Sequence, residues 1–352
     1  MDAPNQDFVG EFPLRVHATG PSRGFYGSNA RFVPWLAEHA RQYDAVVVNG
    51  LWRYHSYGTW RALRGTGVPY YVYPHGMLDP WFKLAYPLKH LKKWLYWPWA
   101  DYRVIRDARA VLFTCEEERA LSRQSFWLYR ARERVVPFGT SAPPGNGSAH
   151  RERFLAANPP LRDRKMVLFL GRIHEKKGCD LLIRAFASVA RRDPLLHLVI
   201  AGPDPTGWMA ALKHLAAELG IGDRVAWPGL LRDEIKWGAF YAAAAFALPS
   251  HQENFGIAVV EALACGLPVL ISNKVNIWRE IAGAGAGFVD ADTAAGARNV
   301  LQAWQAMSDA DVRRMSANAR GLFERQFTAP AMAQGLVSVI ESTASAVRSE
   351  VN

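Results

Sequence analysis

A single stretch, residues 245–271, constrains the fold of this chain more than any other part of the sequence. It opens with the short apolar run AFAL, which ends at a Pro-Ser pair and predicts a buried strand. An apolar helix then runs to Gly266, with Pro268 just beyond it, which is a normal helix exit. Residues 269–271 (VLI) predict the next strand. The stretch is therefore one β-α-β unit, which indicates a parallel sheet.

Two carboxylates of this unit are candidates for a binding site. Glu253 lies in the loop after the first strand, and Glu261 lies eight residues later, in the helix. Ligands of an open α/β sheet bind at the carboxyl ends of its strands, where a helix N-terminus favours an anion. The helix is apolar nearly all round, so we expect it to be buried, and a buried carboxylate needs a partner such as a ribose or sugar hydroxyl. A loop charge and a surface helix charge would be the non-functional alternative.

The rest of the chain alternates between short apolar runs and helical segments, which predicts two α/β domains. We expect strands at about 45–48, 70–73, 110–114, 166–170, 195–202, 224–227, 245–248 and 269–271, and helices at about 29–42, 57–65, 179–191, 207–219, 233–244, 292–306, 309–325 and 329–348. Residues 140–148 are rich in Pro and Gly and predict a linker.

Composition excludes several classes of protein. Half of the residues are hydrophobic and 21% are charged, which is typical of a globular chain and not of a disordered one. The three cysteines, Cys115, Cys179 and Cys265, show neither metal-ligand spacing nor a disulfide framework, which agrees with a reducing cytosol. Residues 1–7 are polar and do not resemble a signal peptide, and no apolar run reaches the roughly 18 residues of a membrane span, so we expect a cytoplasmic protein. A net charge of +10 predicts an acidic partner: a nucleotide, a phospholipid surface or a nucleic acid.

A second motif, Gly171-Arg172-x4-Lys177-Gly178, follows the strand at 166–170 and opens a helix. Two cations, glycines that permit close approach, and a helix N-terminus together suit a diphosphate. Alone, the motif is explained equally well by a solvated basic loop. The two carboxylates downstream favour the binding site.

The combination of Glu253-x7-Glu261, an internal Phe-Gly and a preceding Leu-Pro-Ser resembles the retaining GT-B glycosyltransferases of the family 4 (group 1) type. The resemblance covers nearly all of residues 30–345. It implies an α/β fold of two Rossmann-like domains with a cleft between them. The implied parts are an acceptor-side domain over residues 1–150, a nucleotide-sugar-binding domain over residues 151–328, and a C-terminal helix over residues 329–352 that packs back toward the first domain.

The resemblance also implies roles for residues that bind the donor. Arg172 and Lys177, beside Gly171, would bind the donor diphosphate, and Glu261 would bind the nucleotide ribose. The nucleobase would pack near residues 227–231, which include Gly229.

The donor sugar and its phosphates would face Glu253 and the backbone of Asn254, Phe255 and Gly256. Asn254 departs from the family pattern, in which Gly is common at this place.

His75 follows the strand at 70–73 and precedes Gly76. A lone histidine is more often structural than catalytic, but the Pro-His-Gly context resembles the acceptor-domain histidine that reaches the donor sugar in this family. His75 and Glu253 are therefore the candidate catalytic residues. Asp79 is a weaker candidate, because a turn would also explain it.

The implied activity is transfer of a sugar, with retention, from a UDP- or GDP-linked donor to a glycan or lipid-linked acceptor, in surface polysaccharide biosynthesis. We expect no cofactor and no metal, because cations and amides can stabilise the leaving phosphate and no Asp-x-Asp stands at the site. The first alternative is a non-catalytic nucleotide-sugar-binding or scaffold protein of a glycan assembly complex. The second is a nucleic-acid-binding protein.

Residues 81–99 contain seven aromatic residues, four lysines and no acid. This pattern predicts a peripheral contact with an anionic membrane, which would place the protein at the inner face of the cytoplasmic membrane. A core-packed helical hairpin broken at Pro87 and Pro98 is the alternative. Aromatic residues among cations also suit single-stranded nucleic acid, but no recognition motif supports it, so we expect none bound.

Family members normally begin with a strand, a Gly-rich loop and a helix, whereas the first convincing strand here is at 45–48. We therefore expect about one β-α-β unit, of ~30 residues, to be missing. Truncation, a misassigned start or loss of part of the site would each explain this. An exposed sheet edge would follow, with poor solubility or the need for a partner.

Overall fold

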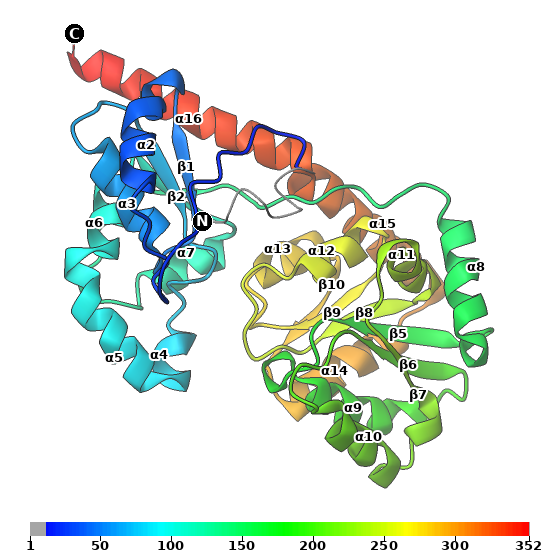
Figure 1. Cartoon of the computed structure of the whole chain (residues 1–352). Helices are drawn as coiled ribbons and strands as arrows, with labels where there is room; N and C mark the ends of the chain where they lie inside the picture. Colours follow the sequence, from blue (N-terminus) through cyan, green and yellow to red (C-terminus); the bar gives the residue numbers. More distant parts are fainter. Residues whose placement is uncertain (1–11, 352) are drawn as a thin grey trace. The chain divides into compact units, whose positions relative to one another are not determined.

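The computed structural model describes the backbone of residues 12–351 and the side chains up to residue 343, so the prediction made for residues 1–7 lies outside the described residues. The chain forms two compact units. The N-terminal unit runs to Pro137 and includes the chain from Gln334 onward, and the C-terminal unit is Phe138–Ala333. Both contain a wholly parallel sheet, which confirms the predicted α/β class (Figure 1).

The N-terminal unit is built on a four-stranded sheet with the order β1-β2-β3-β4. The strands are β1 (Val46–Asn49), β2 (Tyr70–Tyr73), β3 (Ala110–Phe113) and β4 (Glu133–Val135), and the main helices are α2 (Phe32–His39), α3 (Tyr54–Leu63), α6 (Asp101–Asp107) and α7 (Glu116–Ser122). The first three strands confirm the prediction. Strand β4 was not predicted, because its sequence ERV lacks an apolar run. β1 lies at one edge of the described sheet.

Alternate residues of the strands face two different hydrophobic cores, as the two-residue period of a strand requires. Val72 of β2 packs in one core with residues of α2, α3 and α6. Tyr71 of β2 packs in the other core, where α16 (Ala329–Val351) contributes Leu336, Val339 and Ile340. Helix α16 therefore covers one face of this sheet.

The C-terminal unit has a six-stranded sheet with the order β10-β9-β8-β5-β6-β7. Its strands are β5 (Lys165–Leu170), β6 (Leu196–Ala201), β7 (Val225–Gly229), β8 (Ala245–Leu248), β9 (Val269–Ser272) and β10 (Gly287–Asp290). Its helices are α8 (Gly147–Ala157), α9 (Cys179–Ala190), α10 (Met209–Glu218), α11 (Asp233–Ala242), α12 (Ile257–Ala264), α13 (Trp278–Ala284), α14 (Ala294–Gln305) and α15 (Asp309–Leu322). Figure 1 shows α9, α10 and α14 on one face of the sheet, and α11, α12, α13 and α15 on the other.

Three elements of this unit were not predicted. Helix α8 begins at Gly147, so the expected linker over 140–148 ends earlier. Helix α13 has only seven residues, and β10 is a half-buried edge strand of four residues. The last two elements are too short to show a recognisable period.

Residues 81–99 form α4 (Trp81–Ala85), α5 (Pro87–Tyr96) and a short 3-10 helix. The predicted break is confirmed at Pro87, which occupies the first turn of α5, where a missing N–H is tolerated. None of the helices described is long and apolar enough to cross a membrane.

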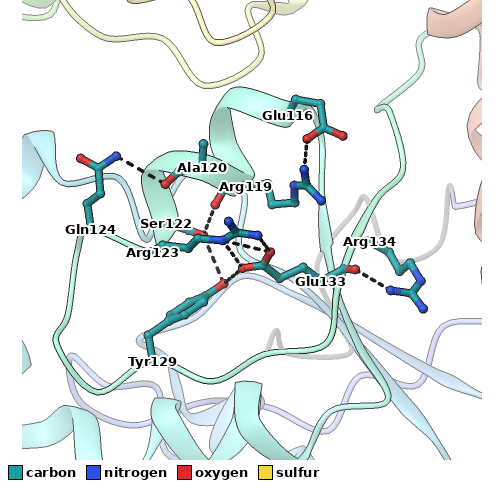
Figure 2. A network of polar contacts seen from close by, with 9 residues as sticks. All are labelled: Glu116, Arg119, Ala120, Ser122, Arg123, Gln124, Tyr129, Glu133 and Arg134. Atoms are coloured by element: carbon teal, nitrogen blue, oxygen red, sulfur yellow. Dashed lines mark hydrogen bonds and ion pairs between the residues drawn. The ribbon is translucent and has the colours of Figure 1, made fainter.

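A network of polar contacts closes the loop between α7 and β4 (Figure 2). Arg123 pairs with Glu133 across the loop. The Tyr129 hydroxyl donates to Oε1 of Glu133 at 2.9 Å and lies 3.2 Å from the Ser122 hydroxyl. The two ends of this loop are therefore held together.

Candidate functional site

The candidate site lies where the order of strands reverses in the C-terminal sheet. The chain enters this sheet at β5, proceeds outward through β6 and β7, and then returns to β8 on the other side of β5. The loops after β5 and β8 therefore leave neighbouring strands at the same edge of the sheet. This is the switch point at which open α/β sheets bind ligands.

These two loops are fastened to each other. The Ser250 hydroxyl and the His251 backbone N–H both donate to the Lys176 carbonyl, each at 2.9 Å. Lys177 forms an ion pair with Glu253, and both side chains are largely buried. The structure thus brings together the basic motif and one predicted carboxylate.

Gly178 is required by the close approach of the two loops. Its φ is +67°, and a Cβ at this position would lie 2.3 Å from the Pro249 carbonyl oxygen. Any other residue would combine a left-handed backbone with a steric clash.

The Glu253 loop is also fixed on its other side. The Glu253 backbone N–H donates to the Lys274 carbonyl at 2.9 Å, and the Asn276 N–H donates to the Glu253 carbonyl at 3.0 Å. The Asn276 side-chain amide donates to Oδ1 of Asn254 at 3.3 Å. Hydrogen bonds to residues 274 and 276 therefore fix the position of the backbone at 253–254, which was predicted to face the donor.

Gly256 and Phe255 connect this loop to α12. Gly256 has a φ of +75° and is the N-cap of α12; as a glycine it offers no side chain to the first N–H groups of the helix. The Phe255 ring is buried and meets Phe138 and Phe327 edge-on, with ring centroids 5.6 Å away in each case. The Phe255 side chain is thus part of the core, and only its backbone borders the loop.

Glu261 is buried on α12 and has a cationic partner that sequence reasoning missed. Nζ of Lys236, on α11, lies 2.7 Å from Oε1 of Glu261. A buried carboxylate requires such a partner. The sequence predicts that Glu261 needs a partner, but it does not identify which of the many basic residues of the chain is that partner.

Glycines line the carboxyl ends of the next strands. The Gly171 N–H donates to the Ala201 carbonyl at 3.0 Å, and the Gly202 N–H donates to the Gly229 carbonyl at 2.8 Å. A Cβ on Gly202 would lie 1.8 Å from the Gly171 carbonyl oxygen, so the backbones are in direct contact there. Arg172 follows Gly171; it is exposed, and within the described part of the chain its side chain makes no hydrogen bond or ion pair.

This arrangement suits an anion with attached hydroxyl groups. Arg172 and Lys177 supply positive charge, and the α12 N-terminus supplies backbone N–H donors. Glu253 and Glu261 supply acceptors that hydroxyl groups can use. No group of three or more His, Cys, Asp or Glu side chains that could hold a metal ion occurs among the residues described.

His75 belongs to the N-terminal unit and has its own neighbours. It follows β2 with a φ of +51°, its Nε2 lies 2.9 Å from Oδ1 of Asn49, and its ring stacks on Tyr73 with centroids 5.4 Å apart. Burial lowers the pKa of His75, and the nearby Glu118 carboxylate opposes this. Its imidazole is therefore predominantly neutral at neutral pH.

The turn that carries His75 is held by two carboxylates. Oε1 of the buried Glu118 accepts from the Gly76 N–H at 2.5 Å, and its Oε2 accepts from the Thr114 N–H and hydroxyl at 2.7 Å. In the sequence Glu118 is one of three consecutive acidic residues in the first turn of α7, and nothing distinguishes it from the other two. Oδ1 of the buried Asp79 accepts from the Trp81 N–H at 2.8 Å, which forms an Asx turn just before α4.

Two parallel α/β units, the second with an anion-suited switch point, define a GT-B-type glycosyltransferase fold. The family described as "Glycosyl transferases group 1" matches residues 150–321, and the "Glycosyl transferase 4-like domain" matches residues 2–139. The chain belongs to the group 1 glycosyltransferases of the family 4 type, as its motifs predicted.

Curated relatives align with part of the chain. The D-inositol 3-phosphate glycosyltransferase of Nocardia farcinica is 39% identical over 183 residues, which are 49% of this chain and 39% of that protein. The mannosylfructose-phosphate synthase of Agrobacterium fabrum is 38% identical over 123 residues, which are 33% of this chain and 27% of that protein. The match thus spans well under half of the length of these relatives.

Solved structures resemble nearly the whole chain. A sucrose-phosphate synthase from Thermosynechococcus elongatus has a TM-score of 0.70 and 23% identity, with 90% of this chain and 78% of that chain covered. HepE of Anabaena, in complex with UDP and glucose, has a TM-score of 0.73 and 18% identity, with 95% and 88% covered. At these identities the likeness establishes the fold.

Proposed function

We propose that this protein transfers a sugar, with retention of configuration, from a nucleotide-diphosphate donor to a hydroxyl of a glycan or lipid-linked acceptor. The observation that carries the proposal is the joining of two loops at the switch point, where Lys177 pairs with Glu253 and the exposed Arg172 belongs to the same loop as Lys177. Membership of the group 1 glycosyltransferases supports it, as does the UDP bound in the structurally similar HepE.

Each part of the donor would have a partner at this site. The exposed Arg172 and the N-terminus of α12 would bind the diphosphate. Lys177 would lie between the negative charge of the diphosphate and that of Glu253. Glu261, held by Lys236, would accept hydrogen bonds from ribose hydroxyls. The backbone at Gly229 would border the base, which leaves UDP and GDP both open as donors.

The chemistry follows from charge development on the diphosphate. The bond between the anomeric carbon and the phosphate oxygen breaks, and its electron pair leaves with the diphosphate. An oxocarbenium-like sugar results, and the acceptor oxygen bonds to it on the same face while its proton passes to the leaving phosphate. Arg172, Lys177 and the α12 N–H groups would stabilise the leaving charge, so the proposed reaction needs no metal.

Two residues are proposed to face the sugar. Glu253, fixed by backbone contacts on both sides and paired with Lys177, would orient the sugar through its hydroxyl groups. His75, neutral and held by Asn49, would hydrogen-bond the sugar from the acceptor-side unit. A role in surface polysaccharide biosynthesis would follow from a lipid-linked acceptor.

Calorimetric titration with UDP and with GDP, each with and without EDTA, tests the donor site. We expect one nucleotide to bind regardless of EDTA, and Arg172→Ala to weaken that binding at least tenfold through loss of a charge-assisted contact. Arg184→Ala is the matched control, because Arg184 is an exposed arginine on α9 of the same unit. Absence of binding by either nucleotide would contradict the proposal. Binding without sugar transfer would instead support a non-catalytic nucleotide-sugar-binding protein.

A further inference from the structure

Helix α5 exposes an apolar stripe to solvent. Leu88, Leu91 and Leu95 follow one another at spacings of three and four residues, so they share one face of the helix. They are 76%, 59% and 70% exposed. The opposite face carries the buried His90, so this helix is packed on one side and apolar on its free side.

Segments next to α5 in the chain expose further apolar residues. Leu84 of α4 is 82% exposed, and the non-helical Tyr86 separates α4 from α5. Trp99, in the short helix after α5, is 68% exposed, and Trp127 is 71% exposed. Trp127 stacks on Trp94 of α5 with ring centroids 5.6 Å apart. We call these exposed residues the α5 surface: Leu84, Leu88, Leu91, Leu95, Trp99 and Trp127.

The structure holds Trp127 in place. Trp127 belongs to the loop whose ends are joined by Arg123, Tyr129 and Glu133 (Figure 2). Nε1 of the buried Trp97 donates to the Leu128 carbonyl at 2.6 Å, which fastens the middle of the loop to the end of α5. An exposed tryptophan on an anchored loop is thus presented beside α5.

Positive charge accompanies the apolar residues. Lys83, Lys89 and Lys92 are exposed, and residues 81–99 contain no Asp or Glu. Lys93 is different, because its Nζ lies over the Trp52 ring at 4.4 Å and so faces the core. The lysines available to a partner therefore lie on the exposed side of the segment.

The α5 surface combines exposed leucines and tryptophans with neighbouring lysines. This combination indicates whether a protein or a membrane is its partner. The cores of protein interfaces are depleted in lysine. At a membrane surface, by contrast, leucines enter the acyl boundary, tryptophans lie at headgroup depth, and lysines reach lipid phosphates. A ten-residue helix is about 15 Å long, half of the roughly 30 Å hydrocarbon core, so α5 would lie along the bilayer.

We propose that the α5 surface binds the face of an anionic phospholipid membrane. This inference goes beyond the proposed transfer reaction, because binding to lipid is measured without donor or acceptor. If both hold, the protein works at the membrane that would carry a lipid-linked acceptor.

Vesicle sedimentation of the full chain tests the inference. The probes are vesicles of phosphatidylcholine alone and of phosphatidylcholine mixed with phosphatidylglycerol. We expect binding to the mixed vesicles, at least tenfold weaker binding to the neutral ones, and release by high salt. The variant L88Q/L91Q/L95Q should lose at least tenfold in affinity, and K89Q/K92Q should lose the preference for phosphatidylglycerol.

The variant L195Q is the matched control, since Leu195 is 51% exposed but lies in the C-terminal unit. It should bind as the unaltered chain does. Because all substituted leucines are exposed, each variant is expected to keep the circular dichroism spectrum and melting temperature of the parent.

Three results would overturn the inference. One is a chain that does not bind mixed vesicles, and another is a leucine variant that binds them as well as its parent. The third is a chain that elutes as a dimer and becomes a monomer in L88Q/L91Q/L95Q, which would assign the α5 surface to a second copy.

Discussion

Nζ of Lys236 lies 2.7 Å from Oε1 of Glu261, and this contact ties helix α11 to helix α12. A second pair, Lys177 with Glu253, ties the loop after β5 to the loop after β8. Both candidate carboxylates thereby have a cationic partner in largely buried surroundings. Each carboxylate retains lone pairs that a hydroxyl group can use, so the two ion pairs leave both carboxylates able to bind a ligand.

The first prediction concerns Lys236. Lys236→Met leaves the Glu261 carboxylate buried without its cation, and should reduce the free energy of unfolding by about 1–3 kcal/mol. Urea denaturation measures the loss, and K236M/E261Q should recover most of it because no unpaired charge remains. If the double variant is as unstable as the single one, the pair does not stabilise the unit.

The second prediction concerns Gly178. Gly178→Ala places a methyl group against the Pro249 carbonyl at a φ of +67°, so it should both destabilise the unit and separate the two loops. Gly207→Ala is the matched control, because Gly207 has a φ of +74° and nothing within 4 Å of its Cβ position. We expect Gly178→Ala to cost about 1–2 kcal/mol more than the control. Equal losses would mean that backbone strain alone is responsible.

The third prediction is a dependence of stability on pH through Asp101. Asp101 is fully buried. Its Oδ1 accepts hydrogen bonds from the Trp52 N–H at 3.2 Å and from the Ser56 hydroxyl at 3.0 Å. Its Oδ2 has no hydrogen-bond partner among the described residues. Burial raises its pKa from 3.8 to about 6. The folded state therefore holds a proton that the unfolded state has lost, and stability falls as pH rises from about 4 to about 6.

A shift of this size corresponds to about 3 kcal/mol. Asp101→Asn keeps the carbonyl acceptor and cannot ionise, so the difference in unfolding free energy between the two proteins should move in favour of the variant across that pH window. Urea denaturation at several pH values measures it. A difference that stays constant with pH would contradict the prediction.

The fourth prediction concerns Glu118 as a positioning residue for His75. Glu118→Gln removes the negative charge that raises the pKa of His75 and replaces an acceptor of the Gly76 or Thr114 N–H with an amide donor. NMR titration should show a lower pKa for His75, and turnover should fall more than KM changes. Glu116→Gln is the control, because Glu116 is an exposed acid in the same first turn. An unchanged pKa of His75 would rule this role out.

Sequence reasoning reached the fold and predicted which loops lie at the same edge of the sheet, because both depend on local patterns. The AFAL and VLI runs, the glycines and the two Glu residues fix a β-α-β unit, and parallel topology then brings the loops after β5 and β8 together. The sequence did not predict the side chains that contact the candidate residues. Lys236, Glu118 and Asn49 approach Glu261, Gly76 and His75 only through tertiary packing, and nothing in their local sequence distinguishes them from other polar residues.

The last prediction separates catalysis from binding at Glu253. Glu253→Gln keeps the size of the side chain and its backbone contacts with Lys274 and Asn276, but removes the charge that pairs with Lys177. Under the proposed function it should reduce turnover at least a hundredfold, about 2.7 kcal/mol of transition-state stabilisation, while nucleotide affinity changes little or rises as Lys177 is released to the diphosphate. Glu175→Gln, an exposed acid in the same basic loop, should leave both unchanged. Steady-state transfer assays and calorimetry together decide the matter: lost affinity with retained turnover per bound donor would make Glu253 a binding residue and not a catalytic one.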